Sequence, residues 1–397
     1  MFTKVNNALF TFVNMIPFSE IETCFSDHFE TRLKGRYICL SHIKPMLSEY
    51  EKLGLVEVVG YSEKGQEIKL IQIGNGPKKI VAWSQMHGNE STTTKAIFDF
   101  LKFLTQDSQF KTAVDFFKNS FTFCVIPILN PDGASVYSRE NANGVDLNRD
   151  AANLTQKESR VLRKIFNNFK PDMCLNLHDQ RTIYSLPNGK PATLSFLSPA
   201  ADVNLSVTNA RKNAMLAIAR MNQVMQKLIP GQVGRYDDAF NSNCVGDTFQ
   251  SLGVPTILFE AGHYPLDYER EITRKYIFYS LLTLFNLIEV EDENDVSYQD
   301  YFSIPENEKN FSDVILRNAL LAQKKVDIVI QFQEKLIDAQ ISFIPVIDEI
   351  VSNTSKKGHK EINLEENEIL INSHENVFVN EEIATISYKI LQKPIFL

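Results

Sequence analysis

Two residues whose side chains can bind metal ions, His87 and Glu90, lie three positions apart and shortly after an apolar run at residues 80–83. An imidazole nitrogen and a carboxylate oxygen are both good ligands for Zn²⁺. We expect the apolar run to form a buried strand, from whose rigid end the loop turns both side chains towards one ion. The pair alone is weak evidence, because a His and a Glu at this spacing also occur on protein surfaces.

Two further apolar runs end in residues suited to the same chemistry. His178 follows Met173–Leu177, and Glu260 follows Val254–Phe259. In an open parallel sheet the carboxyl ends of the strands lie along one rim, where such sheets bind ligands. Glu260 at that rim could accept a proton from a metal-activated water. The alternative is structural: a histidine at a strand end is often a hydrogen-bonded core residue, and a buried glutamate can pair with an arginine.

Several short motifs, taken in their order along the chain, resemble the zinc metallocarboxypeptidase family over about residues 35–288. Each motif is weak alone, and their joint order is specific. The motifs are His87-Gly88-Asn89-Glu90, Asn130-Pro131-Asp132-Gly133, Arg139, Gly144-Val145-Asp146-Leu147-Asn148-Arg149, Leu175-Asn176-Leu177-His178 and Thr256-Ile257-Leu258-Phe259-Glu260-Ala261-Gly262.

The resemblance implies a role for each matching residue. Zinc is held by His87, Glu90 and His178, the catalytic base is Glu260, the scissile carbonyl is polarised by Arg139, and the substrate's terminal carboxylate is bound by Asn148 and Arg149. Asp146 matches an aspartate that holds the second nitrogen of the first zinc histidine. Arginine suits the two cationic roles, because its permanently charged fork can bind carboxylates and developing oxyanions.

Two features of the family match this sequence less well. The family has a mobile tyrosine upstream of the catalytic glutamate, and Tyr236 lies near that position, although it equally fits a tyrosine packed at a loop edge. The floor of the substrate's side-chain pocket falls near Val245 or Asp247. Asp247 would favour a basic C-terminal residue and Val245 an apolar one, while Asp247 also fits a helix cap or a turn. The side-chain preference therefore stays open.

Composition bounds the class of protein. A chain of 397 residues with 44% apolar content can bury a full core and exceeds what one such sheet-and-helix domain requires. The net charge of −8, without a long basic run, argues against nucleic acid and membrane surfaces as partners. The five cysteines are scattered, which argues against a disulfide framework. Residues 1–13 lack a cleavage site typical of an export signal, so we expect a cytoplasmic location. The oligomeric state is not indicated.

Strand and helix patterns alternate along most of the chain. Residues 55–62 and 67–73 predict an antiparallel edge, and residues 79–84 and 121–129 predict buried strands. Helical spacing is found at residues 92–104, in a helix opened by a capping box at Thr155–Glu158, at 208–228 and at 268–288. This alternation predicts an α/β fold, and the resemblance implies a mixed-sheet, three-layer sandwich of the zinc carboxypeptidase type.

The composition changes at the acidic run 289–295, which we interpret as the end of the catalytic domain. The segments beyond it are strand-like, without a convincing long helix. We therefore expect a catalytic domain at residues 1–290 and a small β-rich domain at 291–397, whose function the sequence does not indicate.

The sequence favours a zinc-dependent carboxypeptidase that acts on peptides. A second enzyme class stays open, because His87-Gly88-Asn89-Glu90 also resembles the metal motif of the aspartoacylase and succinylglutamate desuccinylase relatives. Such an enzyme would be a deacylase or amidase acting on N-acyl amino acids or murein peptides. The third possibility is a zinc-free, non-catalytic peptide-binding module, against which all three metal ligands and the base are present.

Overall fold

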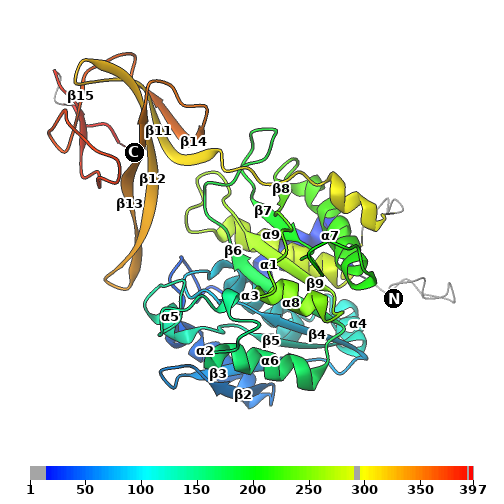
Figure 1. The fold of residues 1–397 in the computed structure, drawn as a ribbon. Coiled ribbons are helices and arrows are strands. Elements are labelled where there is room, and N and C mark those ends of the chain that lie inside the picture. The colour runs from blue at the N-terminus through cyan, green and yellow to red at the C-terminus, as the bar shows by residue number, and fades with distance from the viewer. Residues whose placement is uncertain (1–14, 290–295, 391–392, 397) are drawn as a thin grey trace. The chain divides into compact units, whose positions relative to one another are not determined.

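The computed structural model describes residues 15–289, 296–390 and 393–396 (Figure 1). Residues 1–13, for which we expect no export signal, and residues 290–295 of the acidic run lie outside the described residues. The chain divides into two compact units. The first comprises Met1–Gln180 and Ala192–Asn307, and the second comprises Arg181–Pro191 and Glu308–Leu397. No helix in the described ranges has the length and apolar character that a membrane span requires.

An eight-stranded mixed sheet forms the centre of the first unit, in the order β2-β3-β5-β4-β6-β9-β7-β8. Its strands are β2 (Val56–Tyr61), β3 (Glu67–Ile73), β4 (Lys78–Trp83), β5 (Phe121–Ile126), β6 (Met173–Asp179), β7 (Leu194–Leu197), β8 (Val233–Arg235) and β9 (Thr256–Ala261). The neighbours β4, β6 and β9 are parallel, so their carboxyl ends share one rim. The antiparallel pair β2 and β3 confirms the predicted edge.

Helices cover both faces of this sheet, as Figure 1 shows. They are α1 (Ile21–His28), α2 (Leu40–Lys52), α3 (Thr92–Gln106), α4 (Lys111–Ser120), α5 (Pro131–Ser135), α6 (Lys157–Phe169), α7 (Asn209–Leu228), α8 (Val245–Ser251) and α9 (Glu271–Leu284). Alternate residues of each strand serve opposite faces. In β4, Ile80 and Ala82 join the large apolar cluster with α3, α7 and α9, while Val81 and Trp83 join the smaller cluster with α6 and α8. The predicted three-layer sandwich is confirmed.

The helix at 157–169 begins differently from the predicted capping box. Its N-cap is Gln156, with no side-chain cap, and the Thr155 hydroxyl donates to Asp150 instead. Glu158 is buried and accepts the backbone amide of Glu63 at 3.0 Å. The prediction was wrong because both side chains have other partners, Thr155 the nearby Asp150 and Glu158 the distant Glu63.

The first unit extends beyond the predicted end at residue 290. A 3-10 helix, η3 (Tyr298–Ser303), contributes the buried Tyr301, whose hydroxyl accepts the amide of Ser198. Asn307 donates to the side-chain oxygen of Gln180 at 3.1 Å. These contacts attach residues 298–307 to the first unit.

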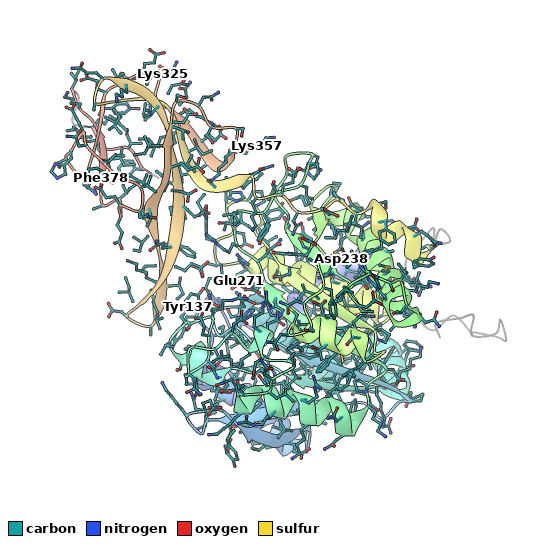
Figure 2. All side chains as sticks on the ribbon, viewed as in Figure 1. Tyr137, Asp238, Glu271, Lys325, Lys357 and Phe378 are labelled. Carbon is teal, nitrogen blue, oxygen red and sulfur yellow. The ribbon has the colours of Figure 1, made fainter. Side chains whose placement is uncertain are left out.

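The second unit is built on β-strands. A four-stranded sheet has the order β13-β12-β11-β14, and a pair, β15-β16, lies beside it in sequence. The strands are β11 (Phe311–Leu321), β12 (Lys324–Ile337), β13 (Gln340–Val351), β14 (Lys357–Asn363), β15 (Ile369–Ile371) and β16 (Ile386–Tyr388). Isoleucines and leucines of both sheets form its core. Some large apolar side chains stay at the surface, among them Phe378, which Figure 2 labels.

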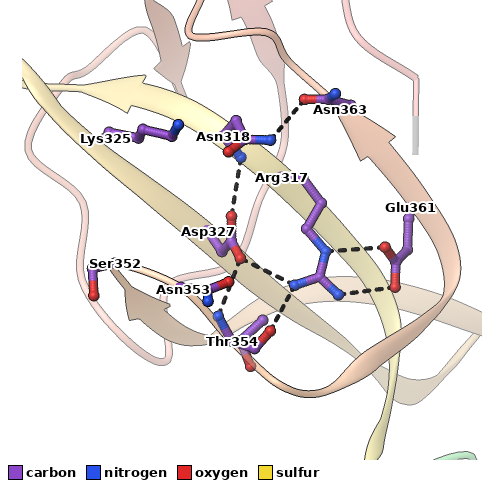
Figure 3. Close-up of a pocket in the computed structure, with 9 residues that line it drawn as sticks. All are labelled: Arg317, Asn318, Lys325, Asp327, Ser352, Asn353, Thr354, Glu361 and Asn363. Atoms are coloured by element: carbon purple, nitrogen blue, oxygen red, sulfur yellow. Dashed lines mark hydrogen bonds and ion pairs between the residues drawn. The ribbon is translucent and has the colours of Figure 1, made fainter.

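Arg317 is the centre of a hydrogen-bonded cluster in this unit (Figure 3). The β11 strand has a bulge at Arg317 and Asn318, and Asn318 adopts a φ of 53°. Arg317 donates to both carboxylate oxygens of Glu361 at 3.0 Å and to Asp327 at 3.0 Å. Its remaining two donors reach the backbone carbonyls of Thr354 and Lys356. All five N–H groups of the guanidinium therefore have acceptors.

Candidate functional site

His87, Glu90 and His178 form a compact, buried group at the carboxyl ends of β4 and β6. The Nδ1 atom of His87 lies 2.8 Å from Oε1 of Glu90, and Nδ1 of His178 lies 2.8 Å from Oε2 of Glu90. The two Nδ1 atoms are 3.1 Å apart. The structure thus brings the three predicted metal ligands together.

The geometry of this group fits a zinc ion. Tetrahedral zinc with ligand bonds of about 2.0–2.1 Å separates its ligand atoms by about 3.3 Å, close to the distances found here. Two imidazole nitrogens that face each other share at most one proton, so a cation between them would satisfy their lone pairs. Although burial opposes it, His87 and His178 hold the pKa of Glu90 well below its usual range, which keeps an anionic ligand available.

Asp146 and Arg139 both contact residues of the group. Oδ1 of Asp146 lies 3.0 Å from Nε2 of His87, so this carboxylate fixes the imidazole with Nδ1 turned towards the other two ligands. Arg139 donates to Asp146 at 3.0 Å and to Glu90 at 3.2 Å, and its side chain is 42% exposed. Burial opposes it, but hydrogen bonds from His87 and Arg139 hold the pKa of Asp146 far below its usual range.

The motif at Asn130–Gly133 supports the loop that carries His87 and Glu90. The Asn130 side chain donates to the carbonyl of Met86 at 3.2 Å and accepts the amide of Gly133 at 2.9 Å. Gly88 lies so close to Gly133 that an added Cβ would stand 2.1 Å from its carbonyl carbon. Both glycines are therefore required by close backbone approach.

Glu260 stands on the strand beside His178. The two residues are register partners in the parallel pair β6 and β9, so their side chains leave the same face of the sheet. Among the described residues, Oε2 of Glu260 and Nε2 of His178 are buried without a hydrogen-bond partner. Burial, together with the Glu90 and Asp179 carboxylates, raises the pKa of Glu260 well above its usual range. A buried carboxylate oxygen without a hydrogen-bond partner is destabilising, and such groups are typical of functional sites.

Asn148 and Arg149 lie on the short helix η2 (Leu147–Arg149), which Asp146 caps by accepting the amide of Asn148. The Asn148 side-chain oxygen accepts the amide of Val245 at 3.1 Å. Arg149 is exposed and donates to the carbonyl of Asn148 at 2.8 Å and to Sγ of Cys244 at 2.9 Å. Within the described parts of the chain, no carboxylate pairs with Arg149.

The remaining candidates are less directly connected to the metal group. Val245 belongs to the apolar cluster beneath α6 and α8. Asp247 is buried and accepts the amide of Asn241 at 2.9 Å, and burial raises its pKa to about 6. Tyr236 directly follows β8, and its amide donates to the carbonyl of Phe196 at 3.1 Å. The role of Tyr236 as a mobile tyrosine stays a prediction.

Sequence reasoning missed two residues beside the metal group, Asp179 and Arg270, both of them buried. Asp179 follows His178 directly, and Arg270 donates to backbone carbonyls at the ends of β6 and β9. For Asp179, the one signal in the sequence is its position directly after the candidate ligand His178. Arg270 lies in a charged stretch, Asp267-Tyr268-Glu269-Arg270, that is typical of a solvated loop.

Comparison with known families and proteins agrees with this site. A model described as zinc carboxypeptidase matches residues 39–243, more than half of the chain. Carboxypeptidase SOL1 of Arabidopsis thaliana is 23% identical over 161 residues, covering 36% of this chain and 33% of its own length. Probable carboxypeptidase 2 of Arthroderma benhamiae is 26% identical over 103 residues, covering 25% and 19%. The chain thus spans about a fifth to a third of the length of these curated relatives.

Solved structures show the same fold. A metallo-carboxypeptidase from Burkholderia cenocepacia has a TM-score of 0.51 at 17% identity, covering 62% of this chain and 68% of that one. Carboxypeptidase A from Helicoverpa armigera has a TM-score of 0.50 at 15% identity, covering 68% and 79%. At these identities the likeness concerns the fold.

Proposed function

The chain belongs to the zinc carboxypeptidase family, and on that premise we propose that it removes the C-terminal residue of peptides. Zinc is the cofactor of this family, and the group of His87, Glu90 and His178 fits it. When bound, the ion supplies Lewis-acid activation of water and of the scissile carbonyl. Every other contribution comes from side chains of this chain.

In the proposed reaction Glu260 moves the proton. Its carboxylate accepts a proton from the attacking water and delivers it to the leaving amine, and its unpartnered Oε2 supports this role. The guanidinium of Arg139 donates to the carbonyl oxygen as negative charge develops there. Asp146 keeps His87 in one orientation throughout. Tyr236 is not needed for these steps and stays a candidate for closing over the substrate.

The observation that carries the exopeptidase proposal is that Arg149 has no carboxylate partner among the described residues. Its exposed guanidinium has only neutral acceptors among the described residues, a carbonyl and a sulfur. A peptide's terminal carboxylate would bind such a fork with two parallel hydrogen bonds. Arg149 lies three residues after Asp146, which contacts His87, so the carboxylate clamp and the metal group share one short segment.

The first experiment tests the metal and the reaction class together. Purified protein should contain about one zinc per chain, lose turnover on chelation and regain it with zinc. A blocked dipeptide, an N-acetyl amino acid and a murein peptide are then compared as substrates. The proposal requires the blocked dipeptide to turn over fastest. Preference for the N-acetyl amino acid or the murein peptide would make the protein a deacylase or amidase, and full activity without metal would overturn the zinc assignment.

The second experiment tests the clamp. Arg149→Ala should weaken transition-state binding of a free-acid peptide by about 2–5 kcal/mol, because a charge-assisted contact is lost. The same peptide with an amidated C-terminus should lose far less. Arg160→Ala is the control, since Arg160 is also exposed and, like Arg149, donates to uncharged acceptors, the backbone carbonyls of Leu154 and Thr155. Equal losses on acid and amide would remove Arg149 from the proposed role.

A further inference from the structure

A buried arginine joins the two strands that carry His178 and Glu260. Arg270 is 1% exposed, and its Nη2 donates to the carbonyl of Gln180 at 2.6 Å while its Nη1 donates to the carbonyl of Ala261 at 2.5 Å. Gln180 lies two residues after His178, and Ala261 lies one residue after Glu260. One rigid guanidinium therefore spans the carboxyl ends of β6 and β9, just where the sheet ladder finishes with the bond from Gln180 N to Ala261 O.

Asp179 extends this connection to the loop with the other metal ligands. Its Oδ2 accepts the amide of Thr92 at 3.1 Å and the hydroxyl of Thr92 at 2.6 Å, two residues after Glu90. Its backbone amide donates to Oε2 of Glu90 at 3.2 Å. Nη1 of Arg270 lies 4.0 Å from Oδ2 of Asp179. Arg36 also reaches this carboxylate, at 3.9 Å. The three segments that carry the metal ligands and Glu260 thus meet at one buried cluster of charges.

The backbone of Arg270 is in a conformation that arginine does not favour. Its φ is 58°, in the left-handed region where glycine has the advantage. The residue is not needed as a helix cap, because Asp267 accepts the amides of Glu271, Ile272 and Thr273 at the start of α9. The reason for an arginine at this position must therefore lie in its side chain.

We propose that Arg270 is a positioning residue, which fixes the distance between Glu260 and the metal group by clamping the ends of β6 and β9. The inference rests on the proposed function for its kinetic meaning, while the clamp itself is a statement about the fold. A lysine at this position can reach one of the two carbonyls and cannot bridge both, since it offers a point charge on a flexible stem.

The test compares variants of the full-length, zinc-loaded protein. Arg270→Lys should lower kcat by about 10- to 100-fold, the range seen when supporting partners of a metal site are changed, with KM within about 3-fold. Amide hydrogen exchange in peptides covering residues 173–183 and 256–263 should become faster, because the strand ends lose their bridge. Arg270→Gly relieves the strained φ, so it serves as a second variant if the lysine variant fails to fold. Added guanidinium ion at low millimolar concentration should restore part of kcat in the glycine variant.

Arg274→Lys is the matched control. Arg274 lies in the first turn of α9, is fully buried, and also donates to two backbone carbonyls, those of Leu33 and Glu30, far from the metal group in sequence. It differs from Arg270 in also donating to the Asp99 carboxylate. Its replacement should lower the melting temperature without lowering kcat of the folded protein. An equal fall of kcat in both variants, or unchanged kcat and exchange in Arg270→Lys, would overturn the positioning role. If the wild type has no peptidase activity, the proposed function fails alone, and the exchange data still decide whether the clamp exists.

Discussion

Arg149 and Arg317 show two different uses of the same side chain. Arg317, in the second unit, has acceptors for all five N–H groups, including two carboxylates. Arg149, beside the candidate metal group, donates to a carbonyl and a sulfur, and the described residues give it no carboxylate. A neutralised guanidinium stabilises its own fold. An unneutralised one at the surface is free to bind an anion.

The same contrast separates the carboxylates of the two regions. Asp327 accepts the amides of Asn318 and Thr354 as well as Arg317, so its charge is fully compensated. Glu260 keeps a buried oxygen without a hydrogen-bond partner in the described structure. Burial without compensation is destabilising, so the unpartnered oxygen of Glu260, on the strand beside His178, favours a functional role for this residue.

The largest effect should come from Glu260→Gln. Loss of the proton acceptor is expected to reduce kcat by about 10²–10⁴-fold, while zinc content stays at about one per chain. The free energy of unfolding should not fall, since Oε2 has no partner to lose. Steady-state kinetics, metal analysis and urea unfolding check the three parts. A variant that fails to fold would place Glu260 among the structural residues.

Asp327→Ala should have the opposite effect to Glu260→Gln, lowering stability and leaving the metal site intact. Removing three accepted hydrogen bonds is expected to destabilise the second unit by about 2–3 kcal/mol, with zinc content unchanged. Urea unfolding followed by circular dichroism measures this, and fluorescence of the single tryptophan, Trp83, reports on the first unit. An unchanged unfolding curve in both signals would contradict the assignment of the Arg317 cluster as structural.

The pH dependence of Glu361→Gln should sharpen the comparison further. The hydrogen bond from Arg317 holds the pKa of Glu361 below its usual value, so this contribution to stability is fully present above the unfolded pKa of about 4.3. It is lost as pH falls through the lower, folded pKa. The carboxylate is 39% exposed, so solvent screening limits the effect to about 0.5 kcal/mol. The variant should be less stable than wild type at pH 7, and the difference should disappear once pH is below the folded pKa. A difference that stays constant with pH would rule out the ion pair as the cause.

Cys244→Ala should have the smallest effect. Sulfur is a weak acceptor, so the loss of its contact with Arg149 is expected to change KM for a free-acid peptide by less than about 3-fold. Peptide kinetics at fixed zinc measure the change. A rise in KM of tenfold or more would show that the thiol orients Arg149 strongly. The contrast with the fully paired Arg317 would then be smaller than proposed.

Much of the first unit could be predicted because apolar runs end abruptly in His178 and Glu260, and that local pattern places both side chains at one rim. Partners supplied by distant segments could not be predicted. Glu158 reads as half of a capping box, yet it binds the amide of Glu63. Arg270 reads as a solvated residue and is buried. The acidic run reads as a domain boundary, although the buried Tyr301 follows it.

The segment Arg181–Pro191 has a consequence for attempts to dissect the molecule. It follows Gln180 directly and belongs to the second unit, within which Ser185 exchanges backbone hydrogen bonds with Glu308 and Ile183 accepts the amide of Phe311. A stop codon after residue 290 or 307 would therefore strip this insertion of its pairing partners while leaving it in the expressed fragment. The second unit therefore cannot be removed by truncating the C-terminus alone. A fragment that contains only the first unit would also require a short linker in place of residues 181–191.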